Sequence, residues 1–202
     1  MERQLHIIST GKQPLEQFVA ICACVHPYVD AIHVREKRKT AREISEFLTE
    51  LIERGIPPKK IIVNDRIDVA VVFGVKGVQL AHHSLSVHQT KRHFPSLSVG
   101  CSVHSLEEAM EAEKSGADYC IYGHIFPTAS KLGAPPRGIE SLRNIVHHVN
   151  IPVIAIGGIH SDNAEQVLQA GAHGIAVMSA VFCAKDPVSE AKKLAKIVKK
   201  MA

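Results

Sequence analysis

Polar and glycine residues recur directly after the short apolar runs of this sequence. When such runs are parallel strands, the residues that follow them meet at one edge, where they can bind anions, hold rings or move protons. The residues in question are Arg35-Glu36-Lys37, Asn64-Asp65-Arg66, Ser102, Gly123-His124, Gly157-Gly158 and Ser179-Ala180. Their types predict a site that binds a phosphorylated small molecule and holds one acid/base group.

Gly157, Gly158, Ser179 and Ala180 are the candidate phosphate ligands. Glycine lets backbone N–H groups approach an anion closely, and the loops after strands seven and eight of a barrel commonly form a phosphate site. A plain tight turn at the glycine pair is the alternative, and it stays open. No Lys-Ser/Thr pair follows, so the segment is not a P-loop.

His124 is the candidate catalytic residue. It follows an apolar run and precedes the segment from Phe126 to Gly138, which is rich in Pro, Gly and small polar residues and is a candidate mobile loop. An imidazole titrates near neutrality, so it can accept and return a proton. The sequence has 13 histidines, and a surface or core role is the common alternative for any one of them.

Arg35, Lys37 and Asn64 are candidate substrate ligands. Arg35 and Lys37 alternate from the end of an apolar run, so both are expected to face the mouth of the fold and bind anionic groups. Asn64 and Asp65 are candidates for holding a ligand or a metal. Asp65 equally fits a pairing with Arg66 or a cap of the next helix, and these interpretations stay open.

The remaining histidines do not predict a metal site. His82-His83, His88 and His93 lie close in sequence, but zincin, Cys/His and facial-triad spacings are absent. We therefore expect no metal and no cofactor. His33 and His104 lie near the ends of apolar runs, where each has an adequate structural role.

Eight short apolar runs rich in β-branched residues alternate with helical patterns. The runs are 5–8, 31–34, 61–63, 77–80, 97–100, 119–122, 152–156 and 174–178. Strict alternation with short loops predicts a parallel sheet covered by helices. Eight similar units without a break in composition favour a closed (β/α)8 TIM barrel over a doubly wound open sheet. We expect residues 1–202 to form one domain.

The composition fits such a domain, with 202 residues, 46% hydrophobic residues and a net charge of +4. Basic residues form no single block and only 4% of residues are aromatic, so nucleic acid is not an expected partner. No apolar run of membrane length occurs, so we expect a cytoplasmic protein. Five cysteines without a C-x-x-C pair indicate neither a disulfide framework nor a zinc knuckle. A homo-oligomer such as a dimer stays open.

Six segments resemble the thiamin phosphate synthase superfamily, in the right order and across nearly the whole chain. They are 33–37, 64–68, 116–119, 123–128, 155–159 and 177–180. The resemblance implies a barrel that binds a phosphorylated thiazole. It also implies a binding mouth that comprises Ser102, Thr128, Ser130, Lys131, Gly158 and Ser179.

Three departures separate the sequence from the synthases of that superfamily. The synthases commonly read Gly-Gln-Glu-Asp after strand four, where the Asp helps to hold magnesium, whereas this sequence reads Ala81-His82-His83-Ser84. They have Pro at the position of His124 and Gln at the position of His33. Thiazole tautomerases of the superfamily, the TenI group, have their catalytic histidine at the position of His124. The resemblance therefore implies an isomerase of that group.

The implied reaction belongs to thiamin biosynthesis and is a cofactor-free proton shift. It converts a 2-carboxy dihydrothiazole-ylidene ethyl phosphate to the aromatic 2-carboxythiazole ethyl phosphate, with His124 moving the proton and the remote phosphate orienting the ring. Two alternatives stay open. One is a magnesium-dependent thiamin phosphate synthase, which is a transferase. The missing Asp in the segment 81–84 argues against it. The other is a non-catalytic regulator that keeps the thiazole phosphate pocket, which the fold alone does not separate from the enzymes.

Overall fold

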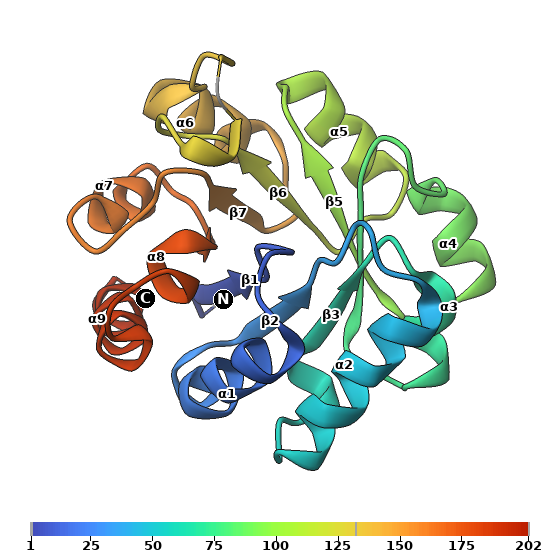
Figure 1. Ribbon diagram of the computed structural model, residues 1–202. Helices are drawn as coiled ribbons and strands as arrows, with labels where there is room; N and C mark the ends of the chain where they lie inside the picture. The colour runs from blue at the N-terminus through green and yellow to red at the C-terminus, as the bar shows by residue number, and fades with distance from the viewer. Residues whose placement is uncertain (1, 132, 202) are drawn as a thin grey trace.

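The eight strands close into one parallel barrel in the computed structural model, which describes residues 2–131 and 133–201 (Figure 1). Each strand pairs with its neighbours in sequence, and β8 closes the ring on β1 with Ile175 opposite Leu5. The predicted TIM barrel is confirmed. The strands are β1 (Gln4–Ile8), β2 (Ala31–Val34), β3 (Ile61–Asn64), β4 (Gly77–Leu80), β5 (Ser98–Val103), β6 (Tyr119–Gly123), β7 (Val153–Ile156) and β8 (Gly174–Val177).

Helices surround the barrel on the outside (Figure 1). They are α1 (Leu15–Val25), α2 (Ala41–Glu53), α3 (Ile67–Val72), α4 (Val87–His93), α5 (Leu106–Lys114), α6 (Gly138–His148), α7 (Ala164–Gln169), α8 (Ser179–Phe182) and α9 (Pro187–Lys200). Thr40 starts α2 with a capping box. The Thr40 hydroxyl accepts from the Glu43 N–H, and the Glu43 carboxylate accepts from the Thr40 N–H. Among the described helices, none combines the length and apolarity needed to cross a bilayer.

Strand side chains alternate between the barrel interior and the layer of helices. The apolar interior cluster consists of Ile8, Ala31, Ile62, Tyr119, Ile121, Ile154 and Ala176. On the outside, Phe18 of α1 packs against Phe47 of α2 and Phe182 of α8, with ring centroids 5.6 and 5.4 Å apart. The barrel is thus a packed core, and the strand ends are the part of it that is open to a ligand.

Two predicted boundaries differ from the structure. β5 was expected over 97–100 but runs to Val103, because its last residues pair with β6, with Ser102 opposite Ile121. Ser102 therefore lies inside the strand and not after it. The second difference is at α7, where the residue types of the pair Ser161-Asp162 predict a helix cap. The helix begins at Ala164, and the Asn163 side chain accepts from the His160 N–H instead.

Candidate active site

The closed parallel barrel brings the predicted site residues to its carboxyl end. Arg35 follows β2, Asn64 ends β3, His124 follows β6, Gly157 follows β7, and Ser179 comes two positions after the end of β8. Because all strands run the same way, these positions surround one opening. The roles proposed for them from the sequence remain predictions.

The turn after β7 is shaped by its two glycines. Both have a positive φ, 104° at Gly157 and 66° at Gly158, a region that favours glycine. A Cβ at Gly157 would lie 2.2 Å from Cβ of His124, and one at Gly158 would lie 2.6 Å from the carbonyl oxygen of Pro127. The glycines are therefore needed for the β6–α6 loop to pack on this turn, so the tight-turn alternative accounts for them without a ligand.

The backbone beside this turn also offers donors for an anion. β7 and β8 are paired, with Ile156 opposite Ala176, so the residues that follow them lie at adjacent strand ends. In the described part of the chain, the N–H groups of Gly158, Ser179 and Ala180 have no hydrogen-bond acceptor. Unpaired N–H groups after adjacent strands suit a phosphate, and this observation supports the predicted phosphate site.

His124 holds the β6–α6 loop. Its side chain is 6% exposed, and its Nε2 lies 3.2 Å from the carbonyl oxygen of Ala134, to which it donates. Its own carbonyl oxygen accepts from the Arg137 N–H at 2.8 Å. The residue predicted to carry a proton thus anchors both its side chain and its backbone to the loop over 126–138.

This anchoring predicts that His124→Ala loosens the loop. Loss of one side-chain hydrogen bond costs about 1 kcal/mol, so tryptic cleavage after Lys131 and Arg137 should become roughly fivefold faster. His124→Gln keeps an N–H donor and is the matched control, with cleavage close to that of the wild type. Limited proteolysis with mass spectrometry measures both rates. Equal cleavage of all three proteins would contradict the anchoring role.

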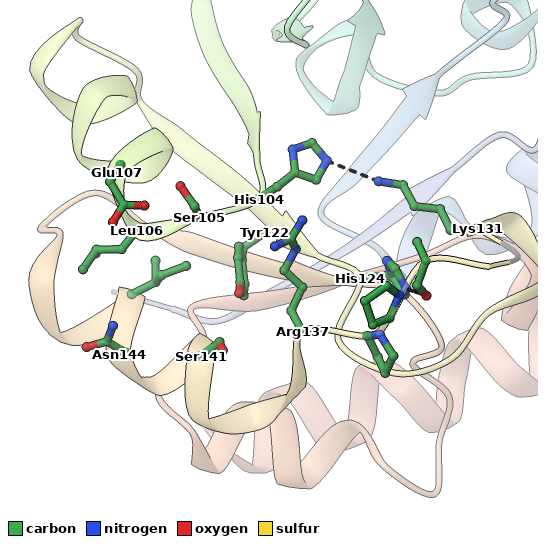
Figure 2. Close-up of a pocket in the computed structure, with 14 residues that line it drawn as sticks. His104, Ser105, Leu106, Glu107, Tyr122, His124, Lys131, Arg137, Ser141 and Asn144 are labelled. Carbon is green, nitrogen blue, oxygen red and sulfur yellow. Dashed lines mark hydrogen bonds between the residues drawn. The ribbon is translucent and has the colours of Figure 1, made fainter.

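A cavity of about 520 Å³ opens beside this loop, between α5 and α6 (Figure 2). Two residues predicted for the site, His124 and Lys131, line it. Lys131 Nζ donates to Nε2 of His104 at 3.2 Å, and the Nδ1–H of that ring faces a carboxylate oxygen of Glu108, also at 3.2 Å. The remaining polar side chains of the lining are Ser105, Glu107, Tyr122, Arg137, Ser141 and Asn144.

A buried polar network lies inside the barrel and begins at Gln4, the first residue of β1. With Oε1 of Gln4 accepting from Nε2 of His6 at 2.9 Å, Nδ1 of His6 must accept from Nε2 of His33 at 3.0 Å. Burial lowers the pKa of both imidazoles, that of His33 to about 3, with Lys76 adding to the shift. Both histidines are therefore neutral at pH 7.

Further polar atoms are buried in the barrel interior. Nδ1 of His33, Oδ1 of Asn64, Oε1 of Gln79 and the hydroxyl of Tyr119 have no hydrogen-bond partner among the described residues. Ser102, a predicted ligand, accepts from Nε2 of Gln79 at 3.0 Å and so joins this buried network. Gln79 was not among the predicted site residues. A lone amide in the apolar run Gly77–Leu80 was the signal that could have found it.

The other predicted ligands have simpler surroundings. Arg35 is half-buried, and burial lowers the pKa of its guanidinium while Glu36 opposes that shift. Lys37 is exposed. Thr128 organises the 3-10 turn Ala129–Lys131, because its hydroxyl accepts from the Ser130 N–H at 3.3 Å and its carbonyl from the Lys131 N–H at 3.1 Å. This turn gives Lys131 its position above the cavity.

Comparison with known proteins identifies the family. A family model described as "Thiamine monophosphate synthase" matches residues 5–181. The chain belongs to this family. It is 45% identical to the thiamine-phosphate synthase of Pyrococcus furiosus over 85% of this chain and 83% of that protein. It is 37% identical to the thiamine-phosphate synthase of Pyrococcus horikoshii over 98% of this chain and 96% of that protein.

A solved structure agrees with these relatives. The thiamine phosphate pyrophosphorylase from Pyrococcus furiosus superposes with a TM-score of 0.84 at 39% identity, covering 98% of this chain and 96% of that one. These comparisons overturn the expectation of an isomerase of the TenI group, since the relatives are named for a transferase. That expectation was based on His124 and on the segment 81–84.

The residues after β4 do not fit the magnesium site that the family resemblance implies. Asp65 supplies a carboxylate, but its neighbour across the strand ends is His83, with Nε2 of the ring 3.8 Å from Oδ2 of Asp65. Within the described residues, no three His, Cys, Asp or Glu side chains come together as ligands of one ion. Magnesium prefers oxygen ligands in a near-octahedral arrangement, and an imidazole in this place does not suit it.

Proposed function

We propose that this protein is a thiamine-phosphate synthase. It joins a phosphorylated thiazole to a pyrimidine that carries a diphosphate on its methylene group, and it releases inorganic diphosphate. The observation that carries the proposal is the likeness to named synthases along the whole chain, at 37% identity over 98% of it and at a TM-score of 0.84. The barrel mouth suits two phosphorylated substrates, because it has cationic side chains and N–H groups without an acceptor in the described part of the chain.

The reaction is a substitution at the methylene carbon. The ring nitrogen of the thiazole forms a bond to that carbon, the bond from the carbon to the diphosphate oxygen breaks, and the diphosphate leaves with the electron pair. No net proton transfer is required, so a buried His124 that anchors a loop is compatible with the chemistry. The main tasks of the protein are to hold two rings in line and to offset charge on the leaving group.

The proposal assigns these tasks to two groups of residues. Backbone N–H groups of Gly158, Ser179 and Ala180 are the proposed ligands of the thiazole phosphate, because they have no acceptor of their own in the described part of the chain. Lys131 and Arg35, from the loops after β6 and β2, are the proposed partners of the diphosphate. Lys131 must exchange its contact with His104 for one with the anion.

The neutral polar network is the proposed partner of the pyrimidine ring. Acceptor atoms of His33, Asn64 and Gln79 have no partner among the described residues, and an amino group on a ring would supply the missing donors. Buried acceptors reject a ligand that lacks such donors, because they would then stay unpaired. The proposal thus includes selection for an aminopyrimidine.

Complementation tests the proposed function in cells. A bacterial strain that lacks its own thiamine-phosphate synthase should grow without added thiamine when it expresses this protein. Vector alone is the negative control, and added thiamine shows that the cells are otherwise viable. Absence of growth despite well-expressed, folded protein would count against the synthase.

A further inference from the structure

We propose that Tyr119 and Gln79 are positioning residues that make the Ser102 hydroxyl a hydrogen-bond donor to the diphosphate of the substrate. The inference rests on the proposed function, because that function supplies the anion. The three residues lie on neighbouring strands of the barrel. Gln79 of β4 pairs in register with Gly100 of β5, and Gly100 pairs with Tyr119 of β6. We call the sequence of contacts from Tyr119 through Gln79 to Ser102 the hydrogen-bond relay.

Gly100 leaves the space in which the two outer side chains approach each other. A Cβ at this position would lie 2.4 Å from the hydroxyl oxygen of Tyr119 and 2.3 Å from Oε1 of Gln79. Both oxygens therefore lie over the same glycine, and any side chain there would collide with them. The Tyr119 ring is also held from its other side, because it packs edge-on against His6 with ring centroids 5.8 Å apart.

The two oxygens over Gly100 are buried and complementary. Tyr119 is 7% exposed and Gln79 is 2% exposed, and neither the Tyr119 hydroxyl nor Oε1 of Gln79 has a partner among the described residues. Burial raises the pKa of Tyr119, so the phenol keeps its proton and is a donor. A small rotation pairs this donor with Oε1 and satisfies both groups. The second lone pair of Oε1 stays available for the amino group of the pyrimidine.

The other end of the Gln79 amide decides the role of Ser102. Nε2 of Gln79 donates to Oγ of Ser102 at 3.0 Å, so the hydroxyl keeps its own hydrogen for another acceptor. If the amide turned over, the Ser102 hydroxyl would donate to Oε1 and would present only lone pairs, which repel an anion. A hydrogen bond from Tyr119 to Oε1 opposes this rotation, because it keeps Oε1 away from Ser102.

The surroundings of Ser102 favour an anionic partner. Ser102 is partly exposed, and His104 lies two positions further along the chain, just past the end of β5. Nε2 of His104 accepts from Nζ of Lys131, which is the proposed cationic partner of the diphosphate (Figure 2). Lys131 therefore reaches the end of the strand that holds Ser102. A donor hydroxyl and a cation at one strand end suit the oxygens of a diphosphate.

The test measures binding of inorganic diphosphate by calorimetry, without turnover, in buffer with and without magnesium. Tyr119→Phe keeps the ring and removes only the hydroxyl. We expect its dissociation constant to rise about tenfold, the size of effect that follows loss of one hydrogen bond to a charged group. Tyr28→Phe is the matched control, because Tyr28 lies in the 3-10 turn before β2 with Lys192 over its ring. Its dissociation constant should stay within about twofold of the wild type.

Double variants show whether Tyr119 acts through the relay, which a merely structural role would not reproduce. In a Ser102→Ala or Gln79→Met background the relay is already cut, so adding Tyr119→Phe should change the dissociation constant by less than about twofold. A further tenfold loss in either background, unchanged binding in Tyr119→Phe alone, or no binding by the wild type would overturn the proposal.

Product formation separates the relay from the proposed function. If the relay fails its test but thiamine phosphate is formed, the synthase proposal remains intact. If diphosphate binding shows the expected dependence on Tyr119 and Ser102 but no thiamine phosphate forms with any cation, the function is refuted and the relay is retained.

Discussion

Acidification from pH 7 to pH 4.5 is expected to destabilise the protein through its buried histidines, and His33→Gln should remove much of that loss. Burial lowers the folded-state pKa of His33 to about 3, against about 6.5 in an unfolded chain. The unfolded state therefore binds the proton first as the pH falls. The stability that the neutral ring contributes is present above pH 6.5 and is lost progressively toward pH 3.

The expected effect is large for a domain of this kind. At pH 4.5 the loss from His33 alone is about 3 kcal/mol, out of a total stability of about 5 to 15 kcal/mol. His6 shifts in the same direction because it is also buried and lies beside His33. Urea denaturation at several pH values measures the slope. His88 is exposed, so His88→Gln is the control and should keep the wild-type dependence of stability on pH. The same dependence in His33→Gln as in the wild type would contradict the prediction.

A carboxylate introduced at Ser179, just after β8, is expected to have the largest effect on substrate binding. Ser179→Asp should lower kcat/KM for the thiazole phosphate about 100-fold, because a negative charge about 4 Å from the phosphate costs several kcal/mol in a partly desolvated mouth. The binding constant for the thiazole phosphate, measured by calorimetry, should weaken in parallel. The main effect is on binding, since the group that reacts lies at the other end of the thiazole.

The matched control places the same charge away from the mouth. Ser96 is exposed and lies in the loop before β5, at the amino-terminal end of the barrel. Ser96→Asp should leave both kcat/KM and the binding constant within about twofold of the wild type, because a screened charge beyond the Debye length of about 10 Å has little effect. Similar losses in both variants would mean that the phosphate binds elsewhere.

The fold was predictable because its signals are local and repeated. Eight runs with β-branched residues, such as Ala31–Val34, alternate with helical patterns, and a start signal such as Thr40 with Glu43 acts within one turn of chain. The end of β5 was less predictable. Ser102 is included in the strand through pairing with β6, a contact between distant parts of the chain.

The strand-end placement of the candidate residues was predictable from the sequence, but their contacts were not. Residues after strands could be assigned to one end of a barrel from connectivity alone. By contrast, the contact of His124 with Ala134 and the buried chain from Gln4 through His6 to His33 depend on how loops and strands meet in space. His124 was predicted as an acid/base residue, and its contact with Ala134 adds a loop-anchoring role that the sequence did not indicate, while the acid/base role stays a prediction.

The most direct test of the synthase assignment follows the phosphorus atoms of both substrates in one reaction. Purified protein is mixed with the thiazole phosphate and the pyrimidine diphosphate and is observed by phosphorus NMR, with magnesium, manganese and cobalt salts in separate samples. The account predicts that thiamine phosphate and inorganic diphosphate appear in equal amounts in at least one sample and that Ser179→Asp slows both. Hydrolysis of the diphosphate without thiamine phosphate, or no change with any cation, would contradict it.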